Sequence, residues 1–314
     1  MLKEDILYEL EARRGTPVSG QELADHFHVS RNAVWKVINS LKEEGYQISS
    51  ARNRGYLLEN SSDILSKEGI LAELKGDCPQ LEIRILEEVD STNNEAKRML
   101  ASGFGGNALI AAKTQTMGRG RKGKSFYSPE GGGLYFSLIL QEDEMTDQLS
   151  LLTIVTACAV LRALERKTGV SLQLKWVNDL FIGNKKAGGI LSEAITDLES
   201  GKTEALVIGI GINLTTEAFP PELEQIATAV DTEVPRNALI AELVKELLSA
   251  PWQEPERELP FYREHSMVLG KTVLYQEERV LAETVDETGA LLIRYENGEE
   301  KTIRGGSILL SEEF

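Results

Sequence analysis

The chain has 314 residues, a net charge of −16, and a composition that is 41% hydrophobic and 27% charged, which favours two or three globular domains. No run approaches the roughly 20 apolar residues of a membrane span, and the first residues lack secretory character, so we expect a cytoplasmic protein without membrane contact. Two cysteines and three scattered histidines argue against a disulfide framework and a zinc cluster, and the sequence assigns no metal ligands and does not show which carboxylates hold magnesium.

The first 62 residues carry the pattern of three short helices followed by a hairpin. Ile6, Leu7 and Leu10 mark the first helix, and Ser19 caps the second. Ser30 caps the third, in which apolar residues recur at the helical spacing of positions 34, 37, 38 and 41. Two strands, at 46–50 and 55–58, complete the segment. This order predicts a winged helix-turn-helix over residues 1–62, with residues 60–63 as a polar linker.

The polar side chains of this segment lie where DNA binding needs them. We expect the third helix to enter a major groove and the hairpin to contact phosphates, through Ser30, Arg31, Asn32 and Lys36 on the helix and Arg52 and Arg54 on the hairpin. The alternative is a protein-interaction domain whose charges are only a solvated face. Residues 1–60 carry a net charge of −1 and the rest −15, which argues against nonspecific nucleic-acid binding by the body of the chain.

Strands and helices alternate between residues 66 and 265, which predicts a central α/β domain with a mixed sheet. We expect strands at 82–86, 108–114, 134–140, 172–176, 185–190 and 205–213, and helices from about 92, over 147–167 and over 237–249. Residues 215–236 read as a loop. Thr92 and Glu95 have the spacing of a capping box, so Ser91–Asn93 can also be read as no more than a helix cap.

The last fifty residues change character. Short apolar stretches near 271–275, 279–285, 291–295 and 301–303 alternate with the turn signals Asp286–Gly289 and Glu296–Gly298. This pattern predicts a small β-barrel of the SH3 kind over residues 266–314. We expect its role to be supporting rather than catalytic.

The segment Gly118–Ser125, GRGRKGKS, matches the phosphate-loop pattern of nucleotide-hydrolysing enzymes. That pattern needs a helix directly after it, whereas Pro129 and three successive glycines from Gly131 prevent one here. The segment therefore predicts a cationic glycine loop between two strands, suited to a carboxylate or phosphate. Lys186, beside Gly188 and Gly189, is a second cation for the same ligand, and a solvated surface turn is the alternative.

No Cys–His or Ser–His–Asp combination suggests a covalent enzyme intermediate. Neutralising the charge of an anionic transition state fits these cations better. Five stretches carry a resemblance that covers the whole chain in order: STN at 91–93, Gln115 to Arg121, KWVNDL at 175–180, Lys186–Gly189 and Gly-Ile-Asn at 211–213. With the N-terminal domain, the chain resembles the bifunctional biotin–protein ligase and biotin-operon repressor family.

The resemblance implies a two-step reaction. Biotin and Mg-ATP give biotinyl-5′-AMP and pyrophosphate, and biotin then passes to a lysine of a carboxylase's biotin carrier domain. It implies Lys186, Arg119 and Arg121 as catalytic cations, and a biotin site of Ser91, Thr92, Asn93, Gln115, Gly118, Arg119, Gly120, Arg121, Lys186 and Gly189. It implies an ATP and adenylate site of Arg121, Phe126, Lys175, Asn178, Asp179 and Asn213.

The resemblance further implies operator DNA as a partner and a homodimer that forms on binding biotinyl-AMP, the corepressor. The loops at 118–133 and 215–236 are expected to move. Val177 stands where the family has proline, and we expect it to fit a strand with little effect. Phe126 takes the place of a larger aromatic residue, so its stacking on adenine stays open. A lipoate–protein ligase, a sensor with an inactive ligase domain and a nucleotide-dependent kinase are the alternatives.

Overall fold

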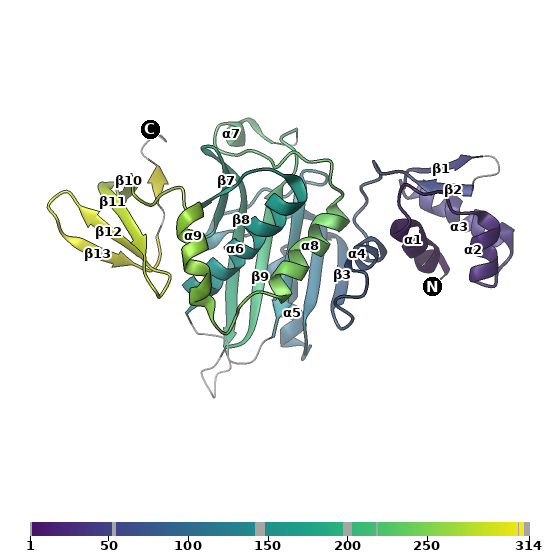
Figure 1. The fold of residues 1–314 in the computed structure, drawn as a ribbon, viewed down its shortest axis with the longest axis horizontal. Helices are drawn as coiled ribbons and strands as arrows, with labels where there is room; N and C mark the ends of the chain where they lie inside the picture. Colours follow the sequence, from purple (N-terminus) through teal and green to yellow (C-terminus); the bar gives the residue numbers. More distant parts are fainter. Residues whose placement is uncertain are drawn as a thin grey trace. The chain divides into compact units, whose positions relative to one another are not determined.

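The computed structural model describes residues 2–51, 55–141, 148–196, 203–217, 219–306 and 308–310. Its contacts divide the chain into two compact units, one of Met1–Pro79 with Thr232–Lys245, the other of Gln80–Asp231 with Glu246–Phe314. Each unit has its own buried core, and Figure 1 shows the elements of both units as a ribbon. Among the described residues, no helix is both long and apolar enough to span a membrane.

The first unit begins with the predicted helix-turn-helix and hairpin. Its elements are α1 (Leu2–Ala12), α2 (Gly20–His26), α3 (Arg31–Glu43), β1 (Ile48–Ala51) and β2 (Gly55–Leu58). Ser19 and Ser30 cap α2 and α3, accepting from the backbone amides of Gln21 and Ala33. The stripe of α3 is confirmed at Val34, Ile38 and Leu41, which are buried among α1, α2 and the hairpin, whereas Val37 is half-buried. Arg52 and Arg54 lie outside the described residues.

Residues 60–63 were expected to form a polar linker, and they are held in place instead. The Ser62 hydroxyl is buried and accepts from the Gln47 amide at 3.2 Å, while Arg14 donates to the Ser62 carbonyl at 2.5 Å. Asp63 forms an ion pair with Arg236 at the start of α8 (Arg236–Leu248). The helix α4 (Lys67–Leu74), capped by Ser66, follows and packs on α1. The sequence did not predict this helix, because the segment is short and only weakly amphipathic.

The second unit is built on a seven-stranded mixed sheet in the order β3-β4-β5-β9-β8-β7-β6. Only β3 and β4 are parallel; the other neighbours are antiparallel. The strands are β3 (Glu82–Val89), β4 (Ala108–Gln115), β5 (Gly133–Leu140), β6 (Gln173–Lys175), β7 (Asp179–Ile182), β8 (Lys185–Thr196) and β9 (Thr203–Asn213). They confirm the predicted mixed sheet. The glycine loop contains a single 3-10 turn at Arg121–Gly123, and the described residues between Ser125 and β5 form no helix.

Helices cover the two faces of this sheet. The helix α5 (Thr92–Ala101) packs Ala96 and Met99 onto alternate residues of β4, β5 and β9. The long apolar helix α6 (Leu149–Thr168) packs against β8 and lies on the other side of the sheet from α5 (Figure 1). The face that carries α5 therefore also carries every second residue of β9, including Gly209 and Gly211.

Two local expectations were wrong in this unit. Residues 215–236 include the short helix α7 (Pro221–Glu224), and residues 226–228 pair with β8 through hydrogen bonds to both backbone groups of Lys186. Val177 lies in the turn between β6 and β7 rather than in a strand, and the Trp176–Val177 peptide bond is cis. The Trp176 indole donates to the Gly289 carbonyl at 3.2 Å, which fixes this turn against the C-terminal strands.

The C-terminal β domain is confirmed as a five-stranded antiparallel sheet in the order β13-β12-β11-β10-β14. Its strands are β10 (Thr272–Tyr275), β11 (Glu278–Val285), β12 (Leu291–Tyr295), β13 (Glu300–Ile303) and β14 (Leu309–Leu310). It follows the 3-10 turn Pro255–Glu258 and the helix α9 (Leu259–His265). Arg263 of α9 donates twice to the Val285 carbonyl, which ties the helix to β11.

Candidate functional site

The first turn of α5 and the end of β4 form a polar cluster. Ser91 is the N-cap residue of α5, but its side chain makes no capping hydrogen bond. Instead the Thr92 amide donates to Gln115 Oε1 at 2.9 Å, and Gln115 Nε2 donates to Ser128 Oγ at 3.0 Å. Ser91, Thr92 and Asn93 are buried and Gln115 is half-buried.

The glycine loop folds back on itself next to Gln115. The Phe126 amide donates to the Gly118 carbonyl at 2.8 Å, and the Gly120 amide donates to the Lys124 carbonyl at 2.7 Å. A Cβ on Gly118 would lie 2.3 Å from the Phe126 carbonyl, so only glycine fits there. Arg119 is exposed and donates to Asn94 Oδ1 at 2.8 Å. The loop is therefore an ordered hairpin-like turn rather than an extended tail.

Lys186 forms the second polar cluster, together with the turn between β6 and β7. Its Nζ donates to Asp179 Oδ1 at 2.6 Å, and the ion pair is partly exposed. Arg121 reaches the same turn, with Nη1 at 3.4 Å from Asn178 Oδ1. The Asn178 amide in turn donates to the Ile190 carbonyl at 2.7 Å, so both partners of the cations are fixed to the sheet.

Burial determines the electrostatics of this second cluster. It lowers the pKa of Arg121 from its ordinary value, while Asp179 acts in the opposite direction. It raises the pKa of Tyr262 on α9 well above the usual range, and Asp179 adds to that rise. The Tyr262 hydroxyl is buried without a hydrogen-bond partner among the described residues. An anionic ligand at this cluster would therefore meet a partly desolvated, permanently charged guanidinium.

Glycines on the central strands let both clusters approach the sheet. A Cβ on Gly209 would lie 2.0 Å from Asn93 Oδ1, and one on Gly211 would lie 2.6 Å from the Phe126 ring. Gly189 pairs with Gly211, and its Cβ position is 3.2 Å from Lys186 Nζ. Directly opposite residues of an antiparallel pair share a face. The Thr92–Gln115 cluster, the Phe126 ring and the Lys186–Asp179 pair therefore lie along one face.

The remaining predicted residues line the second cluster less directly. Asn213 is buried and donates to the carbonyls of Thr228 at 3.0 Å and Lys186 at 3.4 Å. Lys175 pairs with Asp179 across the β6–β7 hairpin, and its buried ammonium lies 5.0 Å from the Phe181 ring centroid. Asn213 and Lys175 therefore hold the strands that carry the second cluster, and neither residue adds an exposed polar group to it.

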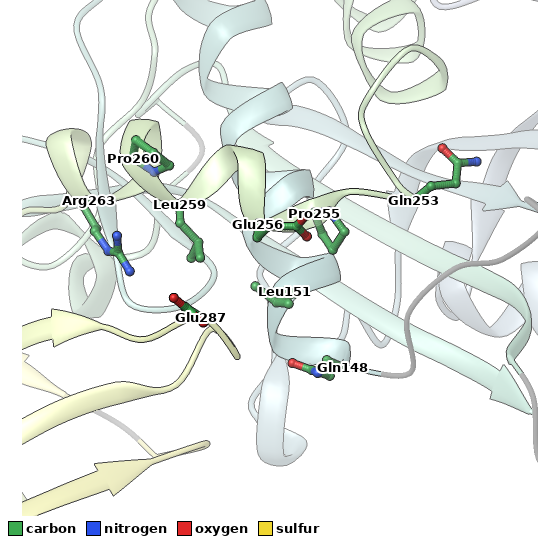
Figure 2. Close-up of a pocket in the computed structure, with 9 residues that line it drawn as sticks. All are labelled: Gln148, Leu151, Gln253, Pro255, Glu256, Leu259, Pro260, Arg263 and Glu287. Atoms are coloured by element: carbon green, nitrogen blue, oxygen red, sulfur yellow. The ribbon is translucent and has the colours of Figure 1, made fainter.

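A hollow of about 620 Å³ occurs elsewhere in the second unit (Figure 2). Its walls come from the start of α6, the segment 253–260, α9 and the turn at Glu287, and Arg263 points towards Glu287 in this view. None of the predicted site residues lines it. The shared face of the sheet, rather than this hollow, is therefore the candidate active site.

The predicted DNA-contacting residues lie in the first unit. Arg31, Asn32 and Lys36 are exposed on α3, away from the buried stripe of Val34, Ile38 and Leu41. Trp35 is exposed on the same side to 52%, which is unusual for so large an apolar ring. The helix therefore presents two cations, an amide and an indole together.

Comparison with known proteins identifies the family. The model of the "Biotin/lipoate A/B protein ligase family" matches residues 86–213, that of an "HTH domain" residues 3–57, and that of the "Biotin protein ligase C terminal domain" residues 269–311. The bifunctional ligase/repressor BirA of Bacillus subtilis is 35% identical over 232 residues, which cover 73% of this chain and 70% of that protein. The chain belongs to the bifunctional ligase/repressor family of biotin–protein ligases.

Relatives that match over other spans agree with this membership. The bifunctional ligase/repressor BirA of Escherichia coli is 27% identical over 312 residues, covering 93% of this chain and 92% of that one. A structure of the biotin protein ligase from Aquifex aeolicus in complex with biotin and ATP matches with a TM-score of 0.61 at 28% identity, over 72% of this chain and 97% of that chain. Family membership thus extends over all three matched segments.

Several residues of the site were missed from the sequence. Gly209 and Gly211 alternate in an otherwise apolar strand, and glycine inside a strand signals the close approach of another group. Ser137 is a serine among the apolar residues of the buried strand β5, and it touches both Thr92 and Asn93. Tyr262 gave no such signal, because its position depends on how α9 packs.

Adding a methyl group at Gly209 tests the close approach. We expect Gly209→Ala to displace Asn93 and to lower the free energy of unfolding by about 1–3 kcal/mol, the usual cost of overpacking a buried site. Gly105→Ala is the control, because nothing lies within 4 Å of its Cβ position. Thermal unfolding and amide hydrogen exchange in α5 measure the effect; equal stability of the two variants would contradict the packing described.

Proposed function

We propose that this protein activates biotin with ATP to biotinyl-5′-AMP, transfers biotin to a lysine of a biotin carboxyl carrier protein, and represses transcription with biotinyl-AMP as corepressor. One observation carries the ligase part: a neutral polar cluster and a cationic cluster lie along one face of the sheet. Biotin has a neutral cyclic urea at one end and a carboxylate at the other, so its two ends match the two clusters.

At the neutral end, we assign the ring of biotin to Ser91, Thr92, Asn93 and Gln115. Their hydrogen-bonding groups are amides and hydroxyls, which suit a cyclic urea that both donates and accepts. The glycine loop, with Gly118 and Gly120, closes over the ligand and excludes water, which protects a mixed anhydride from hydrolysis.

At the cationic end, we assign the biotin carboxylate and the α-phosphate to Lys186, Arg119 and Arg121, with Gly189 leaving room beside them. A carboxylate oxygen attacks the α-phosphorus, the bond to the β-phosphate breaks, and pyrophosphate leaves. Cations at this point neutralise the charge that builds up in the transition state. The nucleotide is assigned to Asn178, Asp179, Asn213 and Lys175, with Phe126 against the adenine.

Transfer follows from the same arrangement. The amine of the acceptor lysine attacks the carbonyl carbon of the mixed anhydride, and AMP leaves. We assign Mg²⁺ to the phosphates of ATP. The acceptor is the carrier domain of a biotin-dependent carboxylase.

We assign operator binding to residues 1–62, with Ser30, Arg31, Asn32 and Lys36 in a major groove and Arg52 and Arg54 at phosphates. Residues 66–265 form the ligase domain and residues 266–314 a C-terminal domain of the SH3-like kind. The active repressor is a homodimer that forms on binding biotinyl-AMP. The exposed cations of α3 support the operator assignment, and family membership supports the other assignments, to which we add a cytoplasmic location.

The exchange of labelled pyrophosphate into ATP tests the first step. The wild type should catalyse exchange only with biotin, and a lipoate-dependent exchange or none would contradict the proposal. Lys186→Ala should slow the exchange by about 10²–10³, the usual cost of one electrostatic donor at a transition state. Lys185→Ala is the matched control, because Lys185 is the next residue in the chain and its ammonium donates to the Glu224 carbonyl rather than to Asp179.

Loss of Arg121 should affect retention of the adenylate more than its formation. Arg121→Gly removes the guanidinium that reaches Asn178, so the loop no longer holds to the β6–β7 turn. We expect pyrophosphate exchange to continue while biotinyl-AMP escapes and modifies lysines of a bystander protein, detected with streptavidin. Lys122→Gly is the control, since Lys122 is exposed and already has a left-handed backbone. Equal retention of biotinyl-AMP by both variants would show that Arg121 does not help the glycine loop to close over the ligand.

Operator affinity should depend on ligands. A DNA-binding segment with a net charge of −1 gains little long-range attraction to phosphates, so one copy binds weakly, and two copies held together gain through effective concentration. Fluorescence anisotropy with an inverted-repeat operator should show tightest binding with biotin, ATP and Mg²⁺ together, and sedimentation should show the dimer in that condition alone. Equal affinity with and without ligands would overturn the coupling.

A further inference from the structure

A continuous series of hydrogen bonds runs from an ion pair at the edge of the site to Thr92. Lys97 of α5 pairs with Glu193 Oε1 of β8 at 2.9 Å, and Asn93 Nδ2 donates to Glu193 Oε2 at 2.8 Å. Ser137, fully buried on β5, lies 2.6 Å from Asn93 Oδ1 and 2.7 Å from Thr92 Oγ1. The series joins three elements that are far apart in the sequence.

The direction of each hydrogen bond in this series follows from the carboxylate. Burial opposes the charged form of Glu193, but hydrogen bonds from Asn93 and Lys97 hold its pKa below the ordinary value, so it only accepts. Asn93 must then turn its NH₂ group towards Glu193 and the Leu191 carbonyl, which leaves Oδ1 facing Ser137. Since Oδ1 cannot donate, the single proton of Ser137 goes to it.

As a result, the Thr92 hydroxyl faces Gln115 as a hydrogen-bond acceptor. Its proton goes to Ser137 Oγ at 2.7 Å, the closer of its two neighbours. Gln115 Oε1, which accepts from the Thr92 amide, lies 3.3 Å from Thr92 Oγ1. Two acceptor oxygens then face each other without a proton between them, and a ligand N–H is the group that satisfies both. Gln115 is half-buried and forms the accessible side of this pair.

We propose that Ser137 and Glu193, supported by Lys97, are positioning residues that turn Thr92 into an acceptor and so make the site select a ligand N–H. The inference rests on the proposed function, because the N–H is then that of the biotin ring. These residues touch neither the carboxylate nor the phosphate of the ligands. They act on recognition of the ring and not on the chemical step.

Calorimetric titration of the full-length protein with biotin alone tests this inference. In Ser137→Ala the Thr92 proton can turn to Gln115 Oε1, so the dissociation constant for biotin should rise about tenfold, the loss of one net hydrogen bond. Ser192→Ala is the matched control: Ser192 Oγ is also buried in the sheet, but has no partner among the described residues. It should bind as the wild type does.

Kinetics separate positioning from general damage to the fold. Ser137→Ala should raise KM for biotin while kcat and KM for ATP stay unchanged, because only binding of the ring is affected. A biotin analogue with oxygen in place of the ring N–H groups should be rejected by the wild type. Ser137→Ala should discriminate against this analogue about tenfold less than the wild type does, because the hydrogen bond that the variant loses is the one that the analogue cannot make. Glu193→Gln, whose amide can donate, should show the same pattern, and decides the matter if Ser137→Ala does not fold.

The outcomes distinguish the inference from the function on which it rests. A wild type that binds no biotin removes the proposed function. A wild type that binds biotin, with Ser137→Ala and Glu193→Gln binding it equally well, removes only the positioning role. An equal loss of kcat, ATP binding and biotin binding in both variants also overturns it, because a purely structural defect produces that pattern.

Discussion

The site depends on a steric constraint: two positions of the central strand β9 must have no side chain. Gly209 leaves space for the amide of Asn93, and Gly211 leaves space for the ring of Phe126. Without these gaps α5 could not bring Thr92 and Asn93 down to the sheet, and the glycine loop could not cover it. The cost is conformational, since glycine loses more freedom on folding than any other residue. Here the antiparallel neighbours β5 and β8 hold the strand on both sides.

The same face separates a cluster of neutral polar groups from a cluster of charged groups. Around Thr92 the groups are hydroxyls and amides, whose burial is tolerable because nearly all are hydrogen-bonded. Around Lys186 the cations are fixed by Asp179 and Asn178, and one of them is desolvated. In such surroundings a charge interacts more strongly with a ligand than it does in water. The acidic body of the chain does not prevent this, because a few close cations decide the local field.

Much of this organisation was predictable because it depends on local patterns of residues in the sequence. The stripe of α3, its Ser30 cap and the apolar strands follow directly from side-chain spacing. Rejecting the phosphate-loop reading rested on Pro129 and the glycines, and it holds because no helix follows Ser125. By contrast, α4 has no clear stripe, and the pairing of Lys186 with residues 226–228 joins segments about 40 positions apart. Spacing along the chain contains no information about such contacts, nor about the burial of Tyr262 in the packing of α9.

The backbone of Lys186 is held by the segment that precedes the boundary between the two units. Its amide donates to the Ile226 carbonyl, its carbonyl accepts from Thr228, and Asn213 holds the carbonyls of both Lys186 and Thr228. The chain passes from the second unit to the first between Asp231 and Thr232, only a few residues after Thr228. Within the first unit, Arg236 pairs with Asp63, next to Ser62, which is bonded to Arg14 and Gln47 of the winged domain. The segment that holds Lys186 is therefore continuous in sequence with the segment that Asp63 anchors within the first unit. Coupling between ligand binding and operator binding requires two arrangements that the ligand stabilises differently, and the proposed contact of Lys186 with an anionic ligand, in place of Asp179, is our candidate for that difference.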